Sequence, residues 1–394
     1  MNILLLAPHP FFQDRGTPIA VDLLLKTLVL RGDAVDVLTY HEGEDRSYTG
    51  PGRVVIHRIA APPGCRNIRP GFSPKKLVAD LWMYRKARQL CRANTYDVIH
   101  AVEESAFMAL RLGRKHQIPF VFDMDSSMPI QMADKLPMLK PILGIMHACE
   151  ARAIRGAEAV TAVCDTLADI ARSAGAKNVA ILRDVPLLDQ YSEHDGRGFR
   201  GELHIDGCAL LYIGNLEPYQ GIDLLIESFA KVSRELGTHL VIVGGTPGHV
   251  QQYRAKASHL SLDDRCHLLG PRPLSDMRAL MAEADVLLSP RTQGNNTPMK
   301  IYSYMASGKP IVATDLPTHT QVLNPETARL SAPEPAAFAT ALETVIRDAD
   351  LRKRIGTRAK QVVETDYSLA VFQSTLNRLY DSLQQTCHHG EGTT

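Results

Sequence analysis

Short apolar runs alternate with amphipathic segments along the whole chain, a pattern typical of strand–helix units around parallel sheets. In the first half we expect strands over residues 2–7, 34–39, 54–59, 97–102, 120–122, 159–163 and 179–182. A second series starts afresh near residue 208 and predicts strands over residues 209–213, 239–243, 266–269, 285–289 and 311–313. The pattern therefore predicts an α/β protein with two doubly wound, Rossmann-like domains. Ligands of such sheets bind at the carboxyl ends of the strands.

A polar, glycine-containing stretch at residues 193–198 separates the two series and is typical of an interdomain linker. We expect an N-terminal domain over residues 1–190, a C-terminal domain over 191–367, and a last helix with a tail over 368–394. Apolar residues of that helix recur every three or four positions and so share one face, at Leu369, Phe372, Leu376, Leu379 and Leu383.

Composition supports this division and narrows the class of protein. The 394 residues are enough for two domains, each with its own core. With 44 Lys and Arg against 43 Asp and Glu, the chain lacks the basic excess of a nucleic-acid binder. Seven scattered cysteines without a CxxC pair are typical of reduced thiols in a cytoplasm. The first apolar run is stopped by Pro8 and predicts a buried strand rather than a signal peptide, and no stretch is long enough to span a bilayer.

The segment from Ser289 to Pro310 carries the most chemical information. Thr297 and Pro298 form an N-cap and first-turn pair, and Gly308 with Pro310 ends the helix. Lys300 then lies in the first turn, where it opposes the helix dipole but suits a bound phosphate. The alternative is a capped core helix whose lysine is merely solvated.

A similar helix start follows the first strand, at residues 14–18. Gly16 would let the backbone approach a ligand, and Thr17 with Pro18 caps a helix. One phosphate-ready helix start in each domain suggests a shared cleft. Neither half contains a GxGxxG or Walker motif, so ordinary dinucleotide and ATP sites lose support.

The chain resembles the family 4 retaining nucleotide-sugar glycosyltransferases. The resemblance covers nearly the whole chain and is carried by the Gly16 loop and by residues 211–230, 241–245, 267–270, 284–290 and 304–314. It implies the GT-B fold, in which two Rossmann-like domains face one another across a cleft. The second domain would hold the nucleotide sugar and the first the acceptor, while the last helix would cross back to the first domain.

By position, the resemblance implies that Gly16 approaches the donor diphosphate, that Gly244 and Gly245 line the donor site, and that Arg272 approaches the base. The chain also departs from the family. Asn215 and Gln220 stand where an Arg and a Lys usually grip the diphosphate, and Asn295 and Ser303 replace two glutamates, one of which is the expected carboxylate on the donor ribose.

Charge-assisted contacts to phosphate contribute about 1.5 to 3 kcal/mol each, so an active enzyme needs replacements for the two missing cations. Lys300, Arg291 and Arg15 are the candidates. A first-turn lysine can stand in for a divalent metal by neutralising the leaving diphosphate. We therefore expect Asn295, Asn296, Thr297 and Lys300 to hold the diphosphate.

A second candidate site follows the strand at residues 120–122. Asp125 stands where the family usually has a His that contacts the reacting sugar, and it could stabilise developing positive charge on that sugar. Asp123 and Asp125 could instead form a DxD metal site, as in single-domain glycosyltransferases, or simply cap a loop. Asp123, Glu103 and Glu104 are candidate acceptor-binding residues. His9, His100 and His147 show no ligand spacing and are expected to be structural.

A basic segment is hidden by the neutral total. Residues 52–92 contain ten Lys and Arg against Asp80 alone. Ser73 and Pro74 begin a helix whose apolar positions, Leu77 among them, fall on one arc and whose basic positions fall mostly on the other. Trp82, the only tryptophan, lies among the charges. Residues 66–92 are therefore a candidate contact with an anionic membrane surface, the alternative being a solvated face with Trp82 in a core or interface.

The leading prediction is a cytoplasmic hexosyltransferase-type enzyme that moves a sugar from a nucleotide-diphosphate donor to an acceptor hydroxyl, with a peripheral position at the inner face of the membrane as a further candidate. The resemblance implies retention of configuration; we expect no cofactor, no divalent metal and no nucleic-acid partner. The alternatives are a catalytically silent binding subunit, a DxD metal-dependent transferase, and epimerisation or hydrolysis of a nucleotide sugar. The sugar, the base and the acceptor are not determined by these residues.

Overall fold

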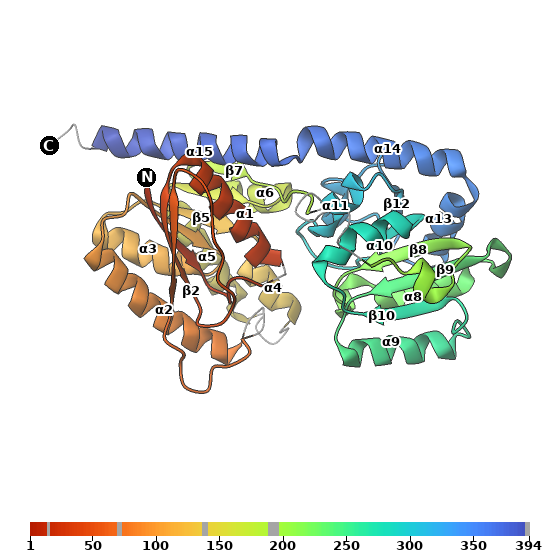
Figure 1. The fold of residues 1–394 in the computed structure, drawn as a ribbon. Helices are drawn as coiled ribbons and strands as arrows, with labels where there is room; N and C mark the ends of the chain where they lie inside the picture. The colour runs from red at the N-terminus through yellow and green to blue at the C-terminus, as the bar shows by residue number, and fades with distance from the viewer. Residues whose placement is uncertain (14–15, 69–72, 136–140, 188–196, 391–394) are drawn as a thin grey trace. The chain divides into compact units, whose positions relative to one another are not determined.

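The structure is a computed structural model that describes residues 1–13, 16–68, 73–135, 141–187 and 197–390. The chain divides into two compact units. The first comprises Met1–Arg183 with Phe372–Thr394, and the second comprises Asp184–Val371 (Figure 1). Most of the expected linker, along with Arg15, lies outside the described residues.

The first unit contains a seven-stranded parallel sheet in the order β3-β2-β1-β4-β5-β6-β7. Its strands are β1 (Asn2–Ala7), β2 (Ala34–Thr39), β3 (Arg53–Arg58), β4 (Val98–Val102), β5 (Phe120–Met124), β6 (Ala159–Ala162) and β7 (Val179–Ile181). Its helices are α1 (Gly16–Arg31), α2 (Pro74–Ala93), α3 (Ser105–His116), α4 (Met128–Lys135), α5 (Leu143–Gly156), α6 (Asp165–Ser173) and α15 (Leu369–Gly390).

The second unit contains a six-stranded parallel sheet in the order β10-β9-β8-β11-β12-β13. Its strands are β8 (Cys208–Ile213), β9 (Thr238–Val243), β10 (Cys266–Gly270), β11 (Val286–Ser289), β12 (Ile311–Thr314) and β13 (Arg329–Ser331). Its α-helices are α7 (Arg200–Leu203), α8 (Ile222–Lys231), α9 (Pro247–His259), α10 (Met277–Glu283), α11 (Lys300–Ala306), α12 (Pro317–Thr320), α13 (Pro335–Arg347) and α14 (Ala349–Asp366). Short 3₁₀ turns occur at Pro218–Gln220, Arg234–Leu236 and Leu274–Asp276.

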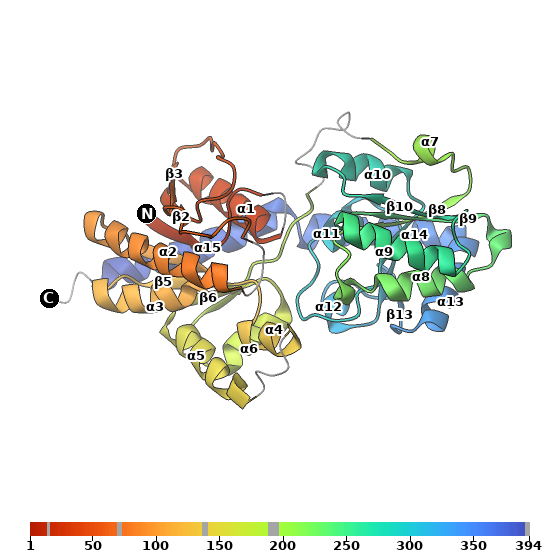
Figure 2. The same ribbon diagram turned by 90° about the horizontal axis from the view of Figure 1, so that it is seen from below.

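Both sheets carry helices on their two faces, as the alternation of strands and helices predicts. In the first unit, α2 and α3 lie on one side of the sheet and α15 on the other (Figures 1 and 2). In the second unit, one core joins the sheet to α8, α9 and α13, and another joins it to α10, α11 and α14. The strand order reverses between β1 and β4 and again between β8 and β11, and these switch points are where doubly wound sheets bind ligands.

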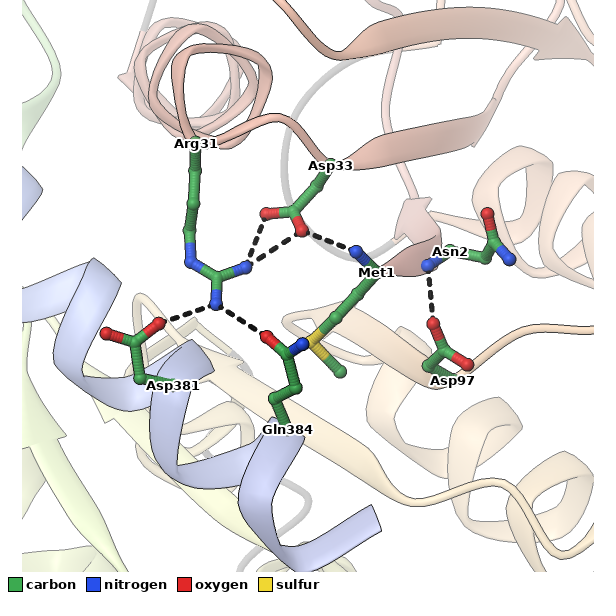
Figure 3. Close-up of polar contacts among 7 residues, drawn as sticks. All are labelled: Met1, Asn2, Arg31, Asp33, Asp97, Asp381 and Gln384. Carbon is green, nitrogen blue, oxygen red and sulfur yellow. Dashed lines mark hydrogen bonds and ion pairs between the residues drawn. The ribbon is translucent and has the colours of Figure 1, made fainter. Parts of the chain in front are cut away.

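The last helix returns to the first unit through a polar contact with the end of α1. Arg31 donates through Nη2 to Asp381 Oδ1 at 2.6 Å and to Gln384 Oε1 at 3.2 Å (Figure 3). Its Nη1 reaches both oxygens of Asp33 at 2.8 and 2.9 Å. Phe372, Leu376, Leu379 and Leu383 are buried as the helical spacing predicts, whereas Leu369, which precedes the first unit's portion of α15, is 47% exposed.

Several local predictions are wrong. The sequence did not predict β13, a strand of only three residues. Thr297 does not cap α11, which begins at Lys300 with Met299 as its N-cap residue, because the backbone from Pro290 to Pro298 forms an irregular loop. Leu77 does not join the buried arc of α2: it is 54% exposed, while Met83, Ala87 and Leu90 are buried.

None of the helices in the described parts of the chain is both long and apolar enough to cross a membrane. The six cysteines whose side chains are described form no disulfide.

Candidate functional site

The ends of β8, β9 and β10, on one side of the switch point of the second sheet, contain glycine. Gly244 follows β9 with φ of 120°, and a Cβ there would lie 1.9 Å from Gly214 O, at the end of the neighbouring β8. The Gly244 amide donates to Gly270 O at 2.7 Å, and the Gly214 amide donates to Val243 O at 3.0 Å. Three strand ends are therefore packed backbone against backbone, which only glycine permits at residue 244.

Lys300, the first residue of α11, has its amine beside the end of β8. Its Nζ is buried, lies 3.7 Å from the centre of the Tyr212 ring, and has no hydrogen-bond partner among the residues that the structure describes. A Cβ on Gly214 would be 3.4 Å from the same Nζ. Burial, and then the nearby Arg291 guanidinium, lower the pKa of the Lys300 amine well below its ordinary value. A buried amine without an acceptor is costly, and a bound anion would relieve that cost.

Arg291 is also buried, but its guanidinium is used to hold its own loop. Nε donates to Gln293 O at 2.7 Å, while Nη1 and Nη2 donate to Asn296 O and Oδ1, both at 3.1 Å. The guanidinium carbon lies 5.2 Å from the centre of the Tyr219 ring. Of the two described cations proposed for the diphosphate, Lys300 is therefore the one without a hydrogen-bond partner.

Asn215 and Gln220 flank the same strand end. Asn215 is exposed, and its backbone carbonyl accepts the Tyr212 hydroxyl at 2.7 Å. Gln220 is 8% exposed, and its Oε1 is buried without a hydrogen-bond partner among the described residues. The end of β8 is thus flanked by neutral polar side chains at the two positions where the resemblance implies cations.

The remaining donor-site candidates lie in the loop from Pro290 to Thr297 and in α11, which follows it. Asn296 is held through both its carbonyl and its side chain by Arg291, as above. Thr297 is 3% exposed with Oγ1 unpartnered in the described structure. Ser303, inside α11, is fully buried, and its Oγ accepts the Leu187 amide at 3.0 Å. The Ser303 hydroxyl, at a position where the resemblance implies a glutamate, therefore already accepts a hydrogen bond from the chain itself.

Three further residues predicted to contact the donor come from other segments of the chain. Arg272 follows Gly270 and forms an ion pair with Glu202 of α7, with Nη2 at 2.6 and 2.8 Å from the two carboxylate oxygens. Gly16 belongs to the first unit, where it begins α1 and a Cβ would meet nothing within 4 Å. Arg15 lies outside the described residues.

In the first unit, Asp123 is held by protein groups at the end of β5. Its Oδ1 accepts the Thr161 hydroxyl at 2.6 Å, and its Oδ2 lies 3.3 Å from His100 Nε2. His100 is fully buried, and its Nδ1 lies 2.9 Å from the Tyr380 hydroxyl of α15. His100 is thus enclosed by protein groups, and its Nε2 has no hydrogen-bond partner among the described residues.

Asp125 is half-buried just beyond that strand end. Two groups just after Asp125 donate to Glu150 of α5. These are the Ser127 hydroxyl at 2.9 Å and the Met128 amide at 3.0 Å. Burial raises the pKa of the Glu150 carboxyl. This carboxyl fixes the turn that leads from Asp125 into α4, a role that the sequence did not indicate.

Glu103 and Glu104 lie at the switch point of the first sheet. Glu103 has φ of 49°, and its amide donates to Asp123 O at 2.8 Å, which ties the ends of β4 and β5 together. Glu104 forms an ion pair with Lys76 of α2 at 2.5 Å. Asp80, also on α2, accepts the Tyr40 hydroxyl at 2.5 Å, and burial, followed by the Glu104 charge, raises its pKa to about 7.

Two glycosyltransferase family models match this chain, one in each half. A family model described as "Glycosyl transferases group 1" matches residues 207–348, and one described as "Glycosyl transferase 4-like domain" matches residues 15–183. A phosphatidyl-myo-inositol mannosyltransferase of Mycobacterium tuberculosis is 25% identical over 97% of each chain. A D-inositol 3-phosphate glycosyltransferase of Corynebacterium glutamicum is 28% identical over 52% of this chain, and the match spans about half (51%) of that protein's own length.

Solved structures of similar fold extend over nearly the entire chain. Sucrose-phosphate synthase from Thermosynechococcus elongatus superposes with a TM-score of 0.76 at 18% identity, covering 98% of this chain and 99% of that one. The Anabaena protein HepE, solved in complex with UDP, gives a TM-score of 0.73 at 17% identity, covering 97% and 100%. At these identities the likeness establishes the fold.

Proposed function

The chain belongs to the glycosyltransferase family that these two models describe, and we propose that it transfers a sugar from a nucleotide diphosphate to an acceptor hydroxyl with retained configuration and without a divalent metal. In the proposed reaction the bond from the sugar's anomeric carbon to the diphosphate breaks as the acceptor oxygen bonds to the same carbon. A diphosphate oxygen takes the acceptor's proton.

The unpartnered Lys300 amine is the observation that carries this proposal. It is buried at the switch point of the second sheet, beside Gly214 and over the Tyr212 ring. The pKa of the free amine is lowered, and a bound diphosphate favours its protonated form. A leaving diphosphate develops negative charge as the sugar departs, and the protonated amine, in a site of low polarity, stabilises that charge strongly. Lys300 would take the place of the two family cations that Asn215 and Gln220 replace.

The donor class is supported by HepE, which has been solved with UDP and with UDP-glucose. We propose that Asn295, Asn296 and Thr297 complete the diphosphate site, that Gly244 and Gly245 line it, and that Asp125 stabilises positive charge on the reacting sugar.

Independence from a divalent metal is proposed because the Lys300 amine lies at the proposed diphosphate site, where its charge can take the place of a metal ion. Turnover in the presence of EDTA tests this point. Loss of activity that Mn²⁺ restores would instead support a DxD site formed by Asp123 and Asp125.

The direct test uses Lys300→Met, which keeps an unbranched side chain one atom shorter and removes the amine. With a panel of nucleotide sugars, we expect turnover to fall by two orders of magnitude or more, about the effect of removing one strong transition-state contact. Lys309→Met is the matched control, because Lys309 follows the other end of α11 and its Nζ donates to Ala282 O at 2.8 Å. Near-normal turnover of Lys300→Met would overturn the assignment.

The same assays separate the alternatives. Nucleotide binding without turnover would support a silent binding subunit, and absence of binding to every nucleotide diphosphate would refute the enzyme proposal. Release of free or epimerised sugar without an acceptor would support hydrolysis or epimerisation.

We also propose that α2 places the enzyme on an anionic membrane that carries the acceptor. Leu77, Val78 and Leu81 are 54%, 39% and 48% exposed on one face of α2, and Lys75, Arg85 and Arg92 are exposed beside them. Apolar residues among cations suit an anionic lipid surface, to which each cation contributes about 1 kcal/mol. Trp82 is half-buried against the core, with the Arg85 guanidinium 5.0 Å from its ring centre.

Flotation with liposomes tests the membrane contact. The double variant Leu77→Ser/Leu81→Ser should lose binding to vesicles that contain anionic lipid, while Leu30→Ser, at a leucine of α1 that is 55% exposed, should bind like the unaltered chain. Equal binding of both variants would overturn the contact.

A further inference from the structure

Three backbone carbonyls of the loop at residues 290–297 accept hydrogen bonds from side chains elsewhere in the second unit. Thr314 Oγ1 donates to Arg291 O at 2.5 Å, Gln321 Nε2 donates to Asn295 O at 3.0 Å, and Thr318 Oγ1 donates to Asn296 O at 2.7 Å. All three donors come from one short stretch, the end of β12 and the region of α12. An irregular loop has no ladder of its own, so these bonds fix its path.

His319 connects this stretch to the strand from which the loop emerges. It is fully buried, with Nε2 at 2.8 Å from Ser289 Oγ and Nδ1 at 2.9 Å from Thr314 O. Ser289 is the last residue of β11 and Thr314 the last of β12. The imidazole therefore joins two neighbouring strand ends at the base of the loop.

The direction of each hydrogen bond follows from the donors available. The Thr314 hydroxyl gives its proton to Arg291 O, and Thr314 O can only accept, so His319 Nδ1 must carry the proton. Nε2 then accepts from the Ser289 hydroxyl. Burial lowers the pKa of His319 to about 3, which keeps the ring neutral and this pattern of bonds intact at ordinary pH.

We propose that Thr318 and His319 are positioning residues that preset the 290–297 loop for the donor diphosphate. The inference rests on the proposed function, because it takes this loop as the diphosphate site. Neither residue needs to touch the donor: Thr318 fixes the carbonyl of Asn296, and His319 fixes the strand end that precedes Arg291.

The test compares Thr318→Val, which removes the hydroxyl while keeping the shape, with Thr318→Ser, which restores it. Thr238→Val is the matched control, since Thr238 is 2% exposed in the same unit and its Oγ1 has no hydrogen-bond partner among the described residues. We expect Thr318→Val to weaken UDP binding and raise the donor KM by about fivefold, the effect of one net hydrogen bond. We expect kcat to change little, and Thr318→Ser to restore both values.

A second readout does not depend on any ligand. Amide hydrogen exchange of the free protein should quicken several-fold across residues 290–299 in Thr318→Val and in His319→Phe, but not in Thr238→Val. His319→Gln, whose amide can both donate and accept, should lie between His319→Phe and the unaltered chain.

The two proposals fail differently. Unchanged loop exchange and unchanged UDP affinity in Thr318→Val would overturn the positioning role while leaving the transferase proposal intact. Faster loop exchange in a chain that binds no nucleotide diphosphate would overturn the diphosphate site, and with it the purpose assigned to the loop.

Discussion

The hydroxyl of Tyr380, in the last helix, lies 2.9 Å from Nδ1 of His100, in the middle of β4. Both residues are fully buried, and 280 positions separate them in the chain. His100 in turn adjoins Asp123 at the end of β5, so the returning helix is connected through a buried imidazole to the strand end that leads to Asp125.

Tyr380→Phe should destabilise the first unit. The substitution leaves His100 Nδ1 buried without its partner, at a cost of about 1–3 kcal/mol in free energy of unfolding. Urea denaturation measures the change. Tyr84→Phe is the control, because Tyr84 lies on α2 at a half-buried position where no hydrogen bond of its hydroxyl is recorded in the described structure. Equal stability of the two variants would mean that the Tyr380 hydroxyl contributes nothing.

Donor binding should take up a proton at Lys300. The pKa of the free amine is lowered by burial and by Arg291, and a bound diphosphate raises it, so between the lowered pKa and the ordinary value of 10.5 binding protonates the amine. Calorimetric titration with UDP in two buffers of different ionisation enthalpy should reveal uptake of up to about one proton per nucleotide. Affinity should weaken as pH rises through this window. Proton uptake that persists in Lys300→Met would assign it to another group.

Discrimination between ribose and deoxyribose should be weak. The resemblance implies a carboxylate on the donor ribose, but Asn295 and Ser303 replace the two family glutamates, and the Ser303 hydroxyl accepts the Leu187 amide. A site built to bind a hydroxyl rejects the analogue that lacks it by on the order of 10⁴-fold, whereas a site without that contact does not. UDP and 2′-deoxy-UDP should therefore bind within about threefold of each other. A strong preference for UDP would show that another residue recognises the 2′-hydroxyl.

Stability should depend on pH through Asp80. Its folded pKa is about 7, above the ordinary value of 3.8, so the folded state holds a proton that the unfolded state has released. The stabilisation is fully present below about pH 4 and is lost as pH rises through 7. Asp80→Asn keeps an acceptor for the Tyr40 hydroxyl and cannot ionise. Its Tm relative to the unaltered chain should rise between pH 5 and pH 8, and a constant difference would contradict the raised pKa.

The sequence by itself determined the two Rossmann-like halves and most strand positions. Strands β1 and β2 begin and end at the expected residues, and Gly308, with φ of 69°, ends α11 as expected. These features follow from local rules, since short apolar runs between amphipathic segments and the freedom of glycine act within a few residues of the chain. The same rules placed Lys300 at the start of a helix that follows a strand end.

Only the tertiary structure decided what surrounds each candidate residue. It buried the Lys300 amine over Tyr212, turned Arg291 onto its own loop, and engaged Asp123 with Thr161 beside His100. It also left Leu77 exposed and placed His319 at the base of the 290–297 loop. The partners of Lys300, Asp123 and His319 come from other helices or strands, and those of Arg291 from later residues of its own loop. Hydrophobic periodicity reports which face of an element is buried, but the atom that a polar side chain meets depends on how distant segments pack.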